Sequence, residues 1–149
     1  MNDLTPSHDA AQCRAQVERL ESIAATMPQV QIPTEHVFSG GMYARTITIP
    51  AGIVLTGAVH TTDHLCVVNG DISVLTDNGP QRLTGLHVLA TKAGAKRAGY
   101  THAPTRWTTI CRTDAQDVHA AEAALVERPE TLQSRNPMIG AGNLPRLED

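Results

Sequence analysis

The feature that most constrains the fold is a series of short, β-branched segments between Val37 and Arg112. These segments are rich in Val, Ile and Thr, whose branched side chains favour extended backbone. Clusters of Gly, Pro, Asn and Asp separate them and predict turns. Many short strands at close spacing are typical of a sandwich, a jelly roll or a barrel. The expected strands cover residues 43–49, 53–59, 65–68, 71–76, 87–91, 99–101 and 106–112.

The pair Asn69–Gly70 lies between two apolar runs and is a strong turn signal in this region. A two-residue hairpin turn needs positive φ at both central residues, which Asn and Gly tolerate. We therefore predict a tight hairpin that joins the strands at 65–68 and 71–76.

Helical periodicity replaces this pattern on either side. In residues 9–27, apolar or small side chains recur at intervals of three and four, as on the buried face of a helix. We favour an amphipathic helix that lies on its own barrel, with a helix–helix contact between subunits as the alternative. Thr113 and Gln116 have the spacing of a capping box, which predicts a second helix that ends before Pro129. The residues on the periodic face of the first helix are Ala10, Cys13, Val17, Leu20, Ala24 and Met27.

Together these patterns predict one domain with four parts. A helical arm covers residues 1–35, and a β-barrel covers 36–112. A C-terminal helix covers 113–128, and an extended tail covers 129–149, where three prolines accompany few apolar residues. Such a tail cannot bury enough apolar surface to fold alone.

Composition argues against several functions. Aromatic residues make up 3% of the 149 residues, which leaves few platforms for stacking nucleic-acid bases. The net charge of −3 offers no basic surface to a phosphate backbone. Cys13, Cys66 and Cys111 are widely spaced, a pattern typical of reduced thiols in a cytoplasm. With no signal-peptide pattern and no long apolar run, we expect neither a membrane partner nor direct nucleic-acid recognition.

Residues 50–70 and 85–101 resemble the first and second motifs of the cupin superfamily. The resemblance implies a mainly β fold, a cupin-like double-stranded β-helix or jelly roll. We expect an N-terminal helix before this roll in the chain, and a C-terminal helix and an extended C-terminal tail after it.

In cupins the two motifs supply three histidines and a glutamate that bind a divalent metal. The corresponding positions in this chain are Ala58, His60, His64 and Arg97. Ala58 offers no ligand, and Arg97 places a permanent positive charge where the cation would lie. We therefore expect no cofactor, and His60 and His64 are the candidate ligands if a divalent metal does bind.

Several further pieces are spread in order over residues 36–127. They are His36-Val-Phe, Gly41-Met-Tyr-Ala-Arg45, Ile49-Pro50-Ala-Gly52, the string from Gly57 to His64, Asn69-Gly70-Asp71, Gly94-Ala-Lys96-Arg97 and Trp107-Thr-Thr. In order and spacing they resemble a cupin-like group encoded by tailed bacteriophages and prophages. Most members of that group have no assigned function, so the resemblance implies a phage context more than a chemistry.

We also predict a polar cluster on one side of the barrel. Arginine, lysine and histidine suit an anionic ligand such as a phosphate or a carboxylate. An arginine-rich surface of this kind also serves as a subunit contact, and the sequence leaves both uses open. The candidate residues are His60, His64, Arg97, Lys96, Arg45 and Tyr100.

The leading functional hypothesis is a non-enzymatic structural or accessory protein of a bacteriophage virion. It would be made in the host cytoplasm, form a homo-oligomer through its jelly roll, and contact capsid or tail components as a decoration, cement or connector protein. A cytoplasmic protein that binds a small anionic metabolite or nucleotide is the first alternative. A metal-dependent cupin enzyme is the second.

Overall fold

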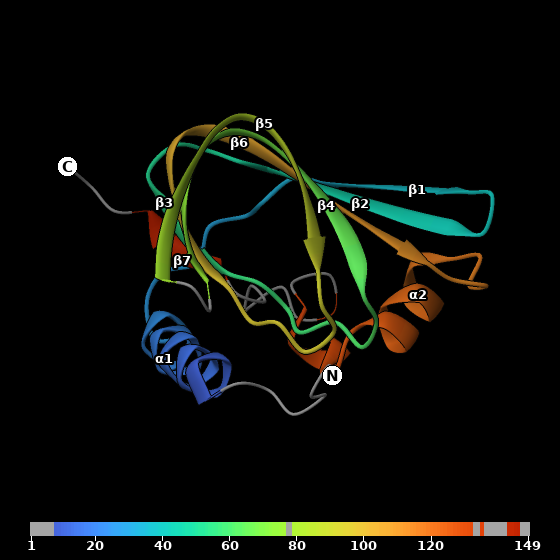
Figure 1. Ribbon diagram of the computed structural model, residues 1–149, viewed down its shortest axis with the longest axis horizontal. Coiled ribbons are helices and arrows are strands. Elements are labelled where there is room, and N and C mark those ends of the chain that lie inside the picture. Colours follow the sequence, from blue (N-terminus) through green and yellow to red (C-terminus); the bar gives the residue numbers. More distant parts are fainter. Residues whose placement is uncertain (1–7, 77–78, 133–134, 136–142, 147–149) are drawn as a thin grey trace.

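The computed structural model describes residues 8–76, 79–132, 135 and 143–146. Within them, seven strands form one strongly curved antiparallel sheet, accompanied by two α-helices and a short 3-10 helix (Figure 1). The elements are α1 His8–Ala24, β1 Thr34–Ser39, β2 Met42–Ile49, β3 Ile53–Thr56, β4 His64–Thr76, β5 Gly79–Thr91, β6 Ala98–Arg112, α2 Val118–Leu125, η1 Pro129–Thr131 and β7 Asn143–Arg146. The expected mainly β fold with an N-terminal and a C-terminal helix is confirmed, and its curvature is consistent with a jelly roll.

The long strand β6 holds the sheet together. Its first part pairs with β3 and its second part pairs with β2, while β4 runs along its other edge. The sheet then continues from β4 to β5, from β2 to β1, and from β3 to β7. Because β6 joins these strands and bends between them, the sheet wraps around a single interior.

The predicted hairpin at Asn69–Gly70 is wrong. Strand β4 runs straight through this pair, and Gly70 lies opposite Gly85 of β5. The pairing of β4 with β6 shifts register here, as it does at a β-bulge. The glycine is needed for a close approach of two strands: a Cβ on Gly70 would lie 2.7 Å from Thr105 Cα and 2.8 Å from the Pro104 carbonyl oxygen. The expected strands at 65–68 and 71–76 are therefore one strand, and those at 99–101 and 106–112 are both parts of β6.

We expect Gly70→Ala to destabilise the fold, because the added methyl group meets backbone atoms that cannot move independently. Overpacking of this kind costs about 1–3 kcal/mol. Gly57→Ala is the matched control, since the nearest atom to its added Cβ is 4.0 Å away. Urea unfolding measures both; equal free energies of unfolding for the two variants would contradict the proposed packing role of Gly70.

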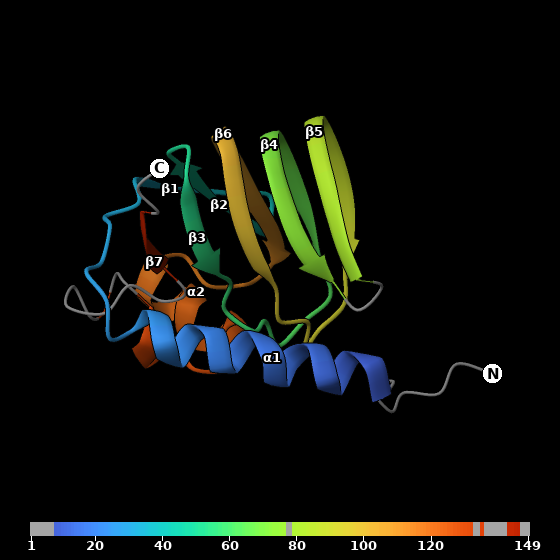
Figure 2. The same cartoon turned by 90° about the vertical axis from the view of Figure 1, so that its left-hand side faces the viewer.

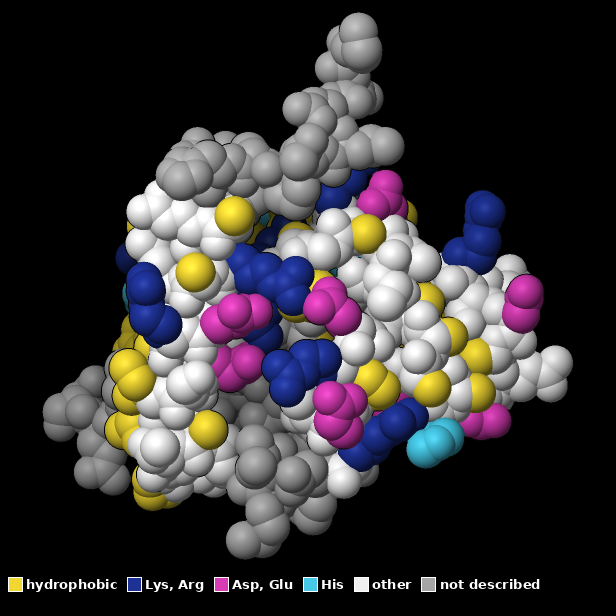
Figure 3. Space-filling model, turned by 90° about the horizontal axis from the view of Figure 1, so that it is seen from below, with side chains coloured by type: hydrophobic (Ala, Val, Ile, Leu, Met, Phe, Trp, Pro, Cys, Tyr) yellow, Lys and Arg dark blue, Asp and Glu magenta, His cyan; other side chains and the backbone are white. Residues whose placement is uncertain are grey.

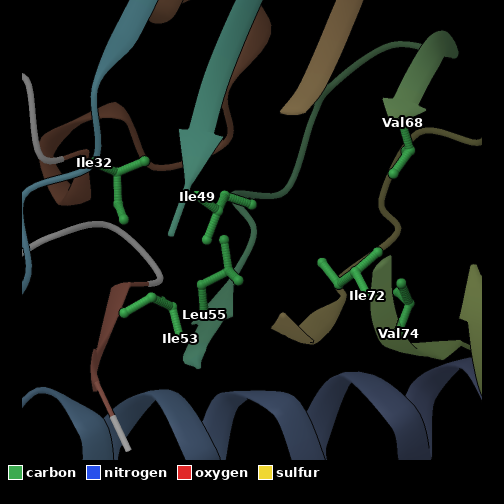
Figure 4. Packing of buried hydrophobic residues seen from close by; sticks show 7 residues of the cluster. All are labelled: Ile32, Ile49, Ile53, Leu55, Val68, Ile72 and Val74. Atoms are coloured by element: carbon green, nitrogen blue, oxygen red, sulfur yellow. The ribbon is translucent and has the colours of Figure 1, made fainter. Parts of the chain in front are cut away.

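Aliphatic side chains fill one part of the interior (Figure 4). They come from the segment before β1 and from strands on both sides of the roll, so the core depends on closure of the sheet. The buried cluster consists of Ile32, Ile49, Ile53, Leu55, Val68, Ile72 and Val74.

Helix α1 lies across the lower ends of the strands (Figure 2). Its buried residues Cys13 and Val17 pack with Ala98 at the start of β6, as the periodicity in residues 9–27 predicts. The expectation that this helix lies on its own barrel is confirmed. The helix ends at Ala24, so Met27 lies beyond it and is 44% exposed.

Helix α2 begins later than predicted. Asp117 is its N-cap, and the Asp117 carboxylate accepts a hydrogen bond from the Ala120 backbone N–H at 2.8 Å. Thr113 instead accepts from the Ala115 N–H in the turn before the helix. The helix buries Ala121 and Leu125 against β2 and β6 in a cluster with Tyr43 and Cys111.

Part of the predicted tail joins the sheet, because β7 pairs with β3. Residues 1–7 of the predicted arm and residues 133–134, 136–142 and 147–149 of the tail lie outside the described residues. Among the described helices, none combines the length and apolar character needed to cross a membrane.

Candidate functional site

A cavity of about 130 Å³ lies inside the roll, between β2, β4 and β6 and beside α2. Its volume is enough for one small organic molecule. Most of its lining is apolar, but several ionisable side chains reach it. These are Tyr43, Arg45, His60, His64, Cys66, Arg97, Cys111 and Glu122.

The six residues of the predicted polar cluster divide into two groups. His60, His64, Arg97 and Arg45 line the cavity, although they come from three separate parts of the chain. The other two residues, Lys96 and Tyr100, do not line it.

Lys96 holds α1 onto the barrel. Its Nζ donates to Glu21 Oε2 at 2.6 Å and to the Gly57 carbonyl at 2.7 Å, and its side chain is only 7% exposed. Tyr100 lies near His102, with ring centroids 5.0 Å apart, and His102 hydrogen-bonds to Ser73. These contacts give Lys96 a structural role and place Tyr100 away from the cavity.

Arg45 is a buried arginine in the cavity wall. It lies on β2, and its Nε is buried without a hydrogen-bond partner among the described residues. Burial lowers the pKa of Arg45, while the nearby Tyr43 and Glu122 partly oppose that shift. A buried donor left unsatisfied costs about 1–3 kcal/mol, and more when the group is charged. The fold therefore tolerates at Arg45 a cost that an acceptor placed in the cavity would remove.

Arg97 is the second arginine of the cavity. Its Nη1 donates to Thr91 Oγ1 at 2.9 Å, and its guanidinium carbon lies 6.0 Å from the centre of the Trp107 ring. The acidic group of the cavity, Glu122, receives a hydrogen bond from Arg135 Nε at 3.3 Å. Because Arg135 offsets Glu122, the two cavity arginines leave an excess of positive charge.

His60 and His64 face each other, with ring centroids 4.4 Å apart. Burial lowers the pKa of His60 to about 4, and the nearby His64 and Arg45 add to the shift. His60 is therefore neutral at pH 7. Burial also lowers the pKa of His64, but hydrogen bonds to the Cys66 thiol and to the Thr62 carbonyl outweigh it and leave that pKa raised.

The resemblance to cupin motifs implies a divalent metal, but the residues present do not fit one. Ala58 and Arg97 both line the cavity at motif positions, and neither can act as a ligand. In the part of the chain that the structure describes, no three His, Cys, Asp or Glu side chains are grouped to hold a metal ion. The metal-dependent enzyme alternative therefore has no support from this arrangement.

Cys66 is a site residue that the sequence analysis missed. It lies on β4 two residues after His64, so both side chains point to the same face of the strand. Burial raises the pKa of the Cys66 thiol, but hydrogen bonds with His64, Thr91 and Trp107 and the charge of His64 bring it down to about 7. The alternation His64-x-Cys66 within an expected strand was the signal that was available.

Comparisons with known proteins find similarity in backbone architecture. No family model matches the chain, and no curated protein matches it in sequence. A cupin superfamily protein from Desulfitobacterium hafniense is 16% identical, covering 60% of this chain and 87% of its own, with a TM-score of 0.47. KdgF from Halomonas sp. is 13% identical over 60% and 91% of the two chains, with a TM-score of 0.48. A cupin 2 conserved barrel domain protein from Leptotrichia buccalis is 9% identical over 64% and 47%, with a TM-score of 0.49. These similarities assign no function to the chain.

The lowered pKa of His60 predicts a loss of stability in acid. A histidine has a pKa of about 6.5 in an unfolded chain, so between that value and the folded value of about 4 the unfolded state binds more protons. The contribution of neutral His60 to the free energy of unfolding is complete above about pH 6.5 and is lost as the pH falls toward 4. Between pH 7 and pH 4.5, the free energy of unfolding should fall by about 2 kcal/mol less in His60→Gln than in the wild type.

Urea unfolding at pH 7 and pH 4.5 measures the effect. The control is His102→Gln, because His102 is exposed on the outside of the sheet. If the wild type and both variants lose the same free energy of unfolding between the two pH values, His60 is not held neutral in the folded state.

Proposed function

We propose that the chain binds a small anionic ligand inside its β-roll. The observation that carries the proposal concerns Arg45, which lines the cavity and whose buried Nε has no hydrogen-bond partner among the described residues. Guanidinium groups bind carboxylate and phosphate oxygens through charge-assisted hydrogen bonds. An anion in the cavity would satisfy Arg45 and offset the charge of Arg97.

The cavity also limits the size of the ligand. Its volume of about 130 Å³ is close to that of an engineered cavity of about 150 Å³ that holds one benzene molecule. The volume therefore favours a compact carboxylate or phosphate over a whole nucleotide. The apolar part of the lining would contact the remainder of such a ligand, and neutral His60 is available to hydrogen-bond to it.

Arg45→Met tests this proposal with two opposite readouts. Methionine removes the buried charge but keeps much of the side-chain volume, so the free energy of unfolding should stay the same or rise. Affinity for the anion should fall by about tenfold to a hundredfold, because a hydrogen bond to a charged group contributes about 1.5–3 kcal/mol. Arg106→Met is the matched control, since the Arg106 side chain is 61% exposed on the same sheet.

Thermal unfolding in increasing inorganic phosphate, and separately in acetate or succinate, measures binding. Ligand at 100 times its dissociation constant stabilises the folded state by about 2.7 kcal/mol. We expect one anion class to stabilise the wild type and the Arg106→Met variant but not Arg45→Met. Equal responses in all three proteins, or no response in the wild type, would contradict the proposal.

A second candidate function is assembly, and an apolar row on the outside of the sheet favours it. Val37 of β1 lies opposite Ala44 of β2, which lies opposite Ile110 of β6. Ile110 lies opposite Leu65 of β4, and Leu65 lies opposite Ala90 of β5. Directly paired residues point to the same side of a sheet, so one apolar row crosses five strands. We call this row and its neighbours Val67, Leu86 and Val88 the outer apolar face.

Large side chains of the outer apolar face are strongly exposed. Val37 is 60% exposed, Leu65 48%, Leu86 67% and Val88 65%. Contiguous exposed apolar surface of this kind marks an interaction site. Strand β5 also pairs only with β4 among the described strands, so its other edge has no strand partner there.

We infer that a second copy of the chain covers this face. An exposed apolar face can pack on its own symmetry copy, because the same patch serves both subunits. Such an oligomer supports the structural or accessory role in a bacteriophage virion that the phage resemblance suggests. In that role, other surfaces of the oligomer would contact capsid or tail components.

The double variant Leu65→Lys/Val88→Lys tests the assembly role. Charges on the outer apolar face should convert an oligomer into a folded monomer, because burying unpaired lysines in a contact is unfavourable. Gln81→Lys is the control, since Gln81 is exposed on β5 away from the apolar row. Sedimentation velocity gives the oligomeric state; a monomeric wild type at tens of micromolar would contradict this function. Mass spectrometry of virions from a phage that encodes the chain would then distinguish a virion protein from a cytoplasmic one.

A further inference from the structure

Polar side chains from three strands surround the sulfur of Cys66. Thr91 Oγ1 of β5 lies 3.5 Å from Cys66 Sγ, and Thr109 Oγ1 of β6 lies 4.0 Å away. His64 of β4 and Trp107 of β6 lie near enough to lower the pKa of this thiol. The residue is only 2% exposed, but it lines the cavity. A molecule small enough to enter the cavity therefore has access to a sulfur that larger reagents cannot reach.

The hydroxyl of Thr91 is oriented to donate to this sulfur. Arg97 Nη1 donates to Thr91 Oγ1 at 2.9 Å, and a guanidinium group has no acceptor. The Thr91 hydroxyl thus accepts from Arg97 and keeps its own proton for Cys66 Sγ. Arginine polarises this hydroxyl, so its hydrogen bond stabilises a negative charge on the sulfur.

The ring of His64 is oriented to exchange a proton with the thiol. Its Nδ1 lies 2.9 Å from the Thr62 carbonyl oxygen, which can only accept a hydrogen bond. Nδ1 therefore carries a hydrogen, and Nε2 is the ring nitrogen that can accept the thiol proton of Cys66. Transfer of the thiol proton to Nε2 produces a thiolate beside an imidazolium, as in other activated cysteines.

We propose that Cys66 is a site of oxidation by hydrogen peroxide or another small hydroperoxide. The Cys66 thiolate attacks the terminal peroxide oxygen, so that an S–O bond forms while the O–O bond breaks. Cys66 is oxidised to a sulfenic acid, and the peroxide is reduced to water or to an alcohol. The departing oxygen takes the proton that His64 received from the thiol. This activity goes beyond the anion binding proposed above and does not require a bound anion.

The other cysteines of the chain provide internal controls. Cys111 lines the same cavity, but burial raises its pKa to about 11, against about 7 for Cys66. Cys13 is buried in the contact between α1 and the barrel. The fraction of thiolate at pH 7 is therefore much larger for Cys66 than for Cys111. The larger thiolate fraction favours reaction of Cys66, whereas a thiolate of lower pKa is the weaker nucleophile. Because the first effect is larger, we expect Cys66 to react about a hundredfold faster than Cys111.

The experiment exposes the full chain to hydrogen peroxide at pH 7, without added phosphate or carboxylate. Dimedone traps sulfenic acids, and peptide mass spectrometry then gives the labelling rate of each cysteine. We expect Cys66 to be labelled at least tenfold faster than Cys13 and Cys111. His64→Gln and Thr91→Val should each slow Cys66 labelling severalfold, whereas the exposed-site variant His102→Gln should not.

The dependence of the rate on pH separates proton transfer from a purely structural effect. The charged or titratable groups facing Cys66 are His64 on β4, Arg97 before β6 and Cys111 on β6, with His60 behind His64. The midpoint of Cys66 labelling should lie near pH 7 in the wild type and rise in His64→Gln. Equal labelling of the three cysteines, no labelling at all, or an unchanged midpoint in His64→Gln would overturn the proposal.

Discussion

The bend of β6 is the constraint on which the rest of the structure depends. Two fully buried threonines fix this bend. Thr101 Oγ1 accepts a hydrogen bond from the Ile53 N–H at 3.0 Å and donates one to the Pro50 carbonyl at 2.6 Å. Thr105 Oγ1 accepts a hydrogen bond from the Asp71 N–H at 3.1 Å. These hydrogen bonds replace ladder bonds that are lost where β6 leaves one partner strand and joins the next. Gly70 lets β4 approach at the same point. The sheet can therefore curve around an interior without leaving these backbone groups unsatisfied.

Closure of the sheet encloses an interior with an aliphatic part and a polar part. Ile49, Leu55, Ile72 and Val74 of the aliphatic cluster (Figure 4) form part of the cavity wall. Arg45, Arg97 and the pair His64–Cys66 line the same cavity. Among the described residues, the buried Arg45 Nε has no hydrogen-bond partner in this cavity. Such an arrangement lowers stability and is typical of a functional site. Seen from below, the surface carries Lys and Arg side chains interspersed with Asp and Glu (Figure 3). Two ion pairs, Arg14–Glu127 and Lys96–Glu21, join α1 to the rest of the domain.

The sequence was informative wherever one periodicity dominated. The buried face of α1 followed from the spacing of Cys13 and Val17, and most strands followed from their β-branched residues. It was misleading at Asn69–Gly70, because the same dipeptide that favours a hairpin turn also serves a bulge inside a long strand. Three of the cavity residues, His60, His64 and Arg97, were expected from motif positions, and Arg45 was expected as part of a polar cluster. The contrast between paired Lys96 and Arg45, whose Nε has no partner among the described residues, depends on three-dimensional packing. Cys66 was missed because its activation depends on Thr91, which becomes its neighbour only when β5 pairs with β4.

The central claim is that the buried Nε–H of Arg45 is held ready for an anion, and NMR of arginine side chains tests it most directly. The Nε–H resonance of Arg45 can be assigned by its loss in Arg45→Met and followed while inorganic phosphate or a small carboxylate is added. The account predicts a saturable shift of this resonance, with the exposed Arg106 unaffected. A resonance that does not move, or that moves only in proportion to bulk salt as Arg106 does, would contradict it.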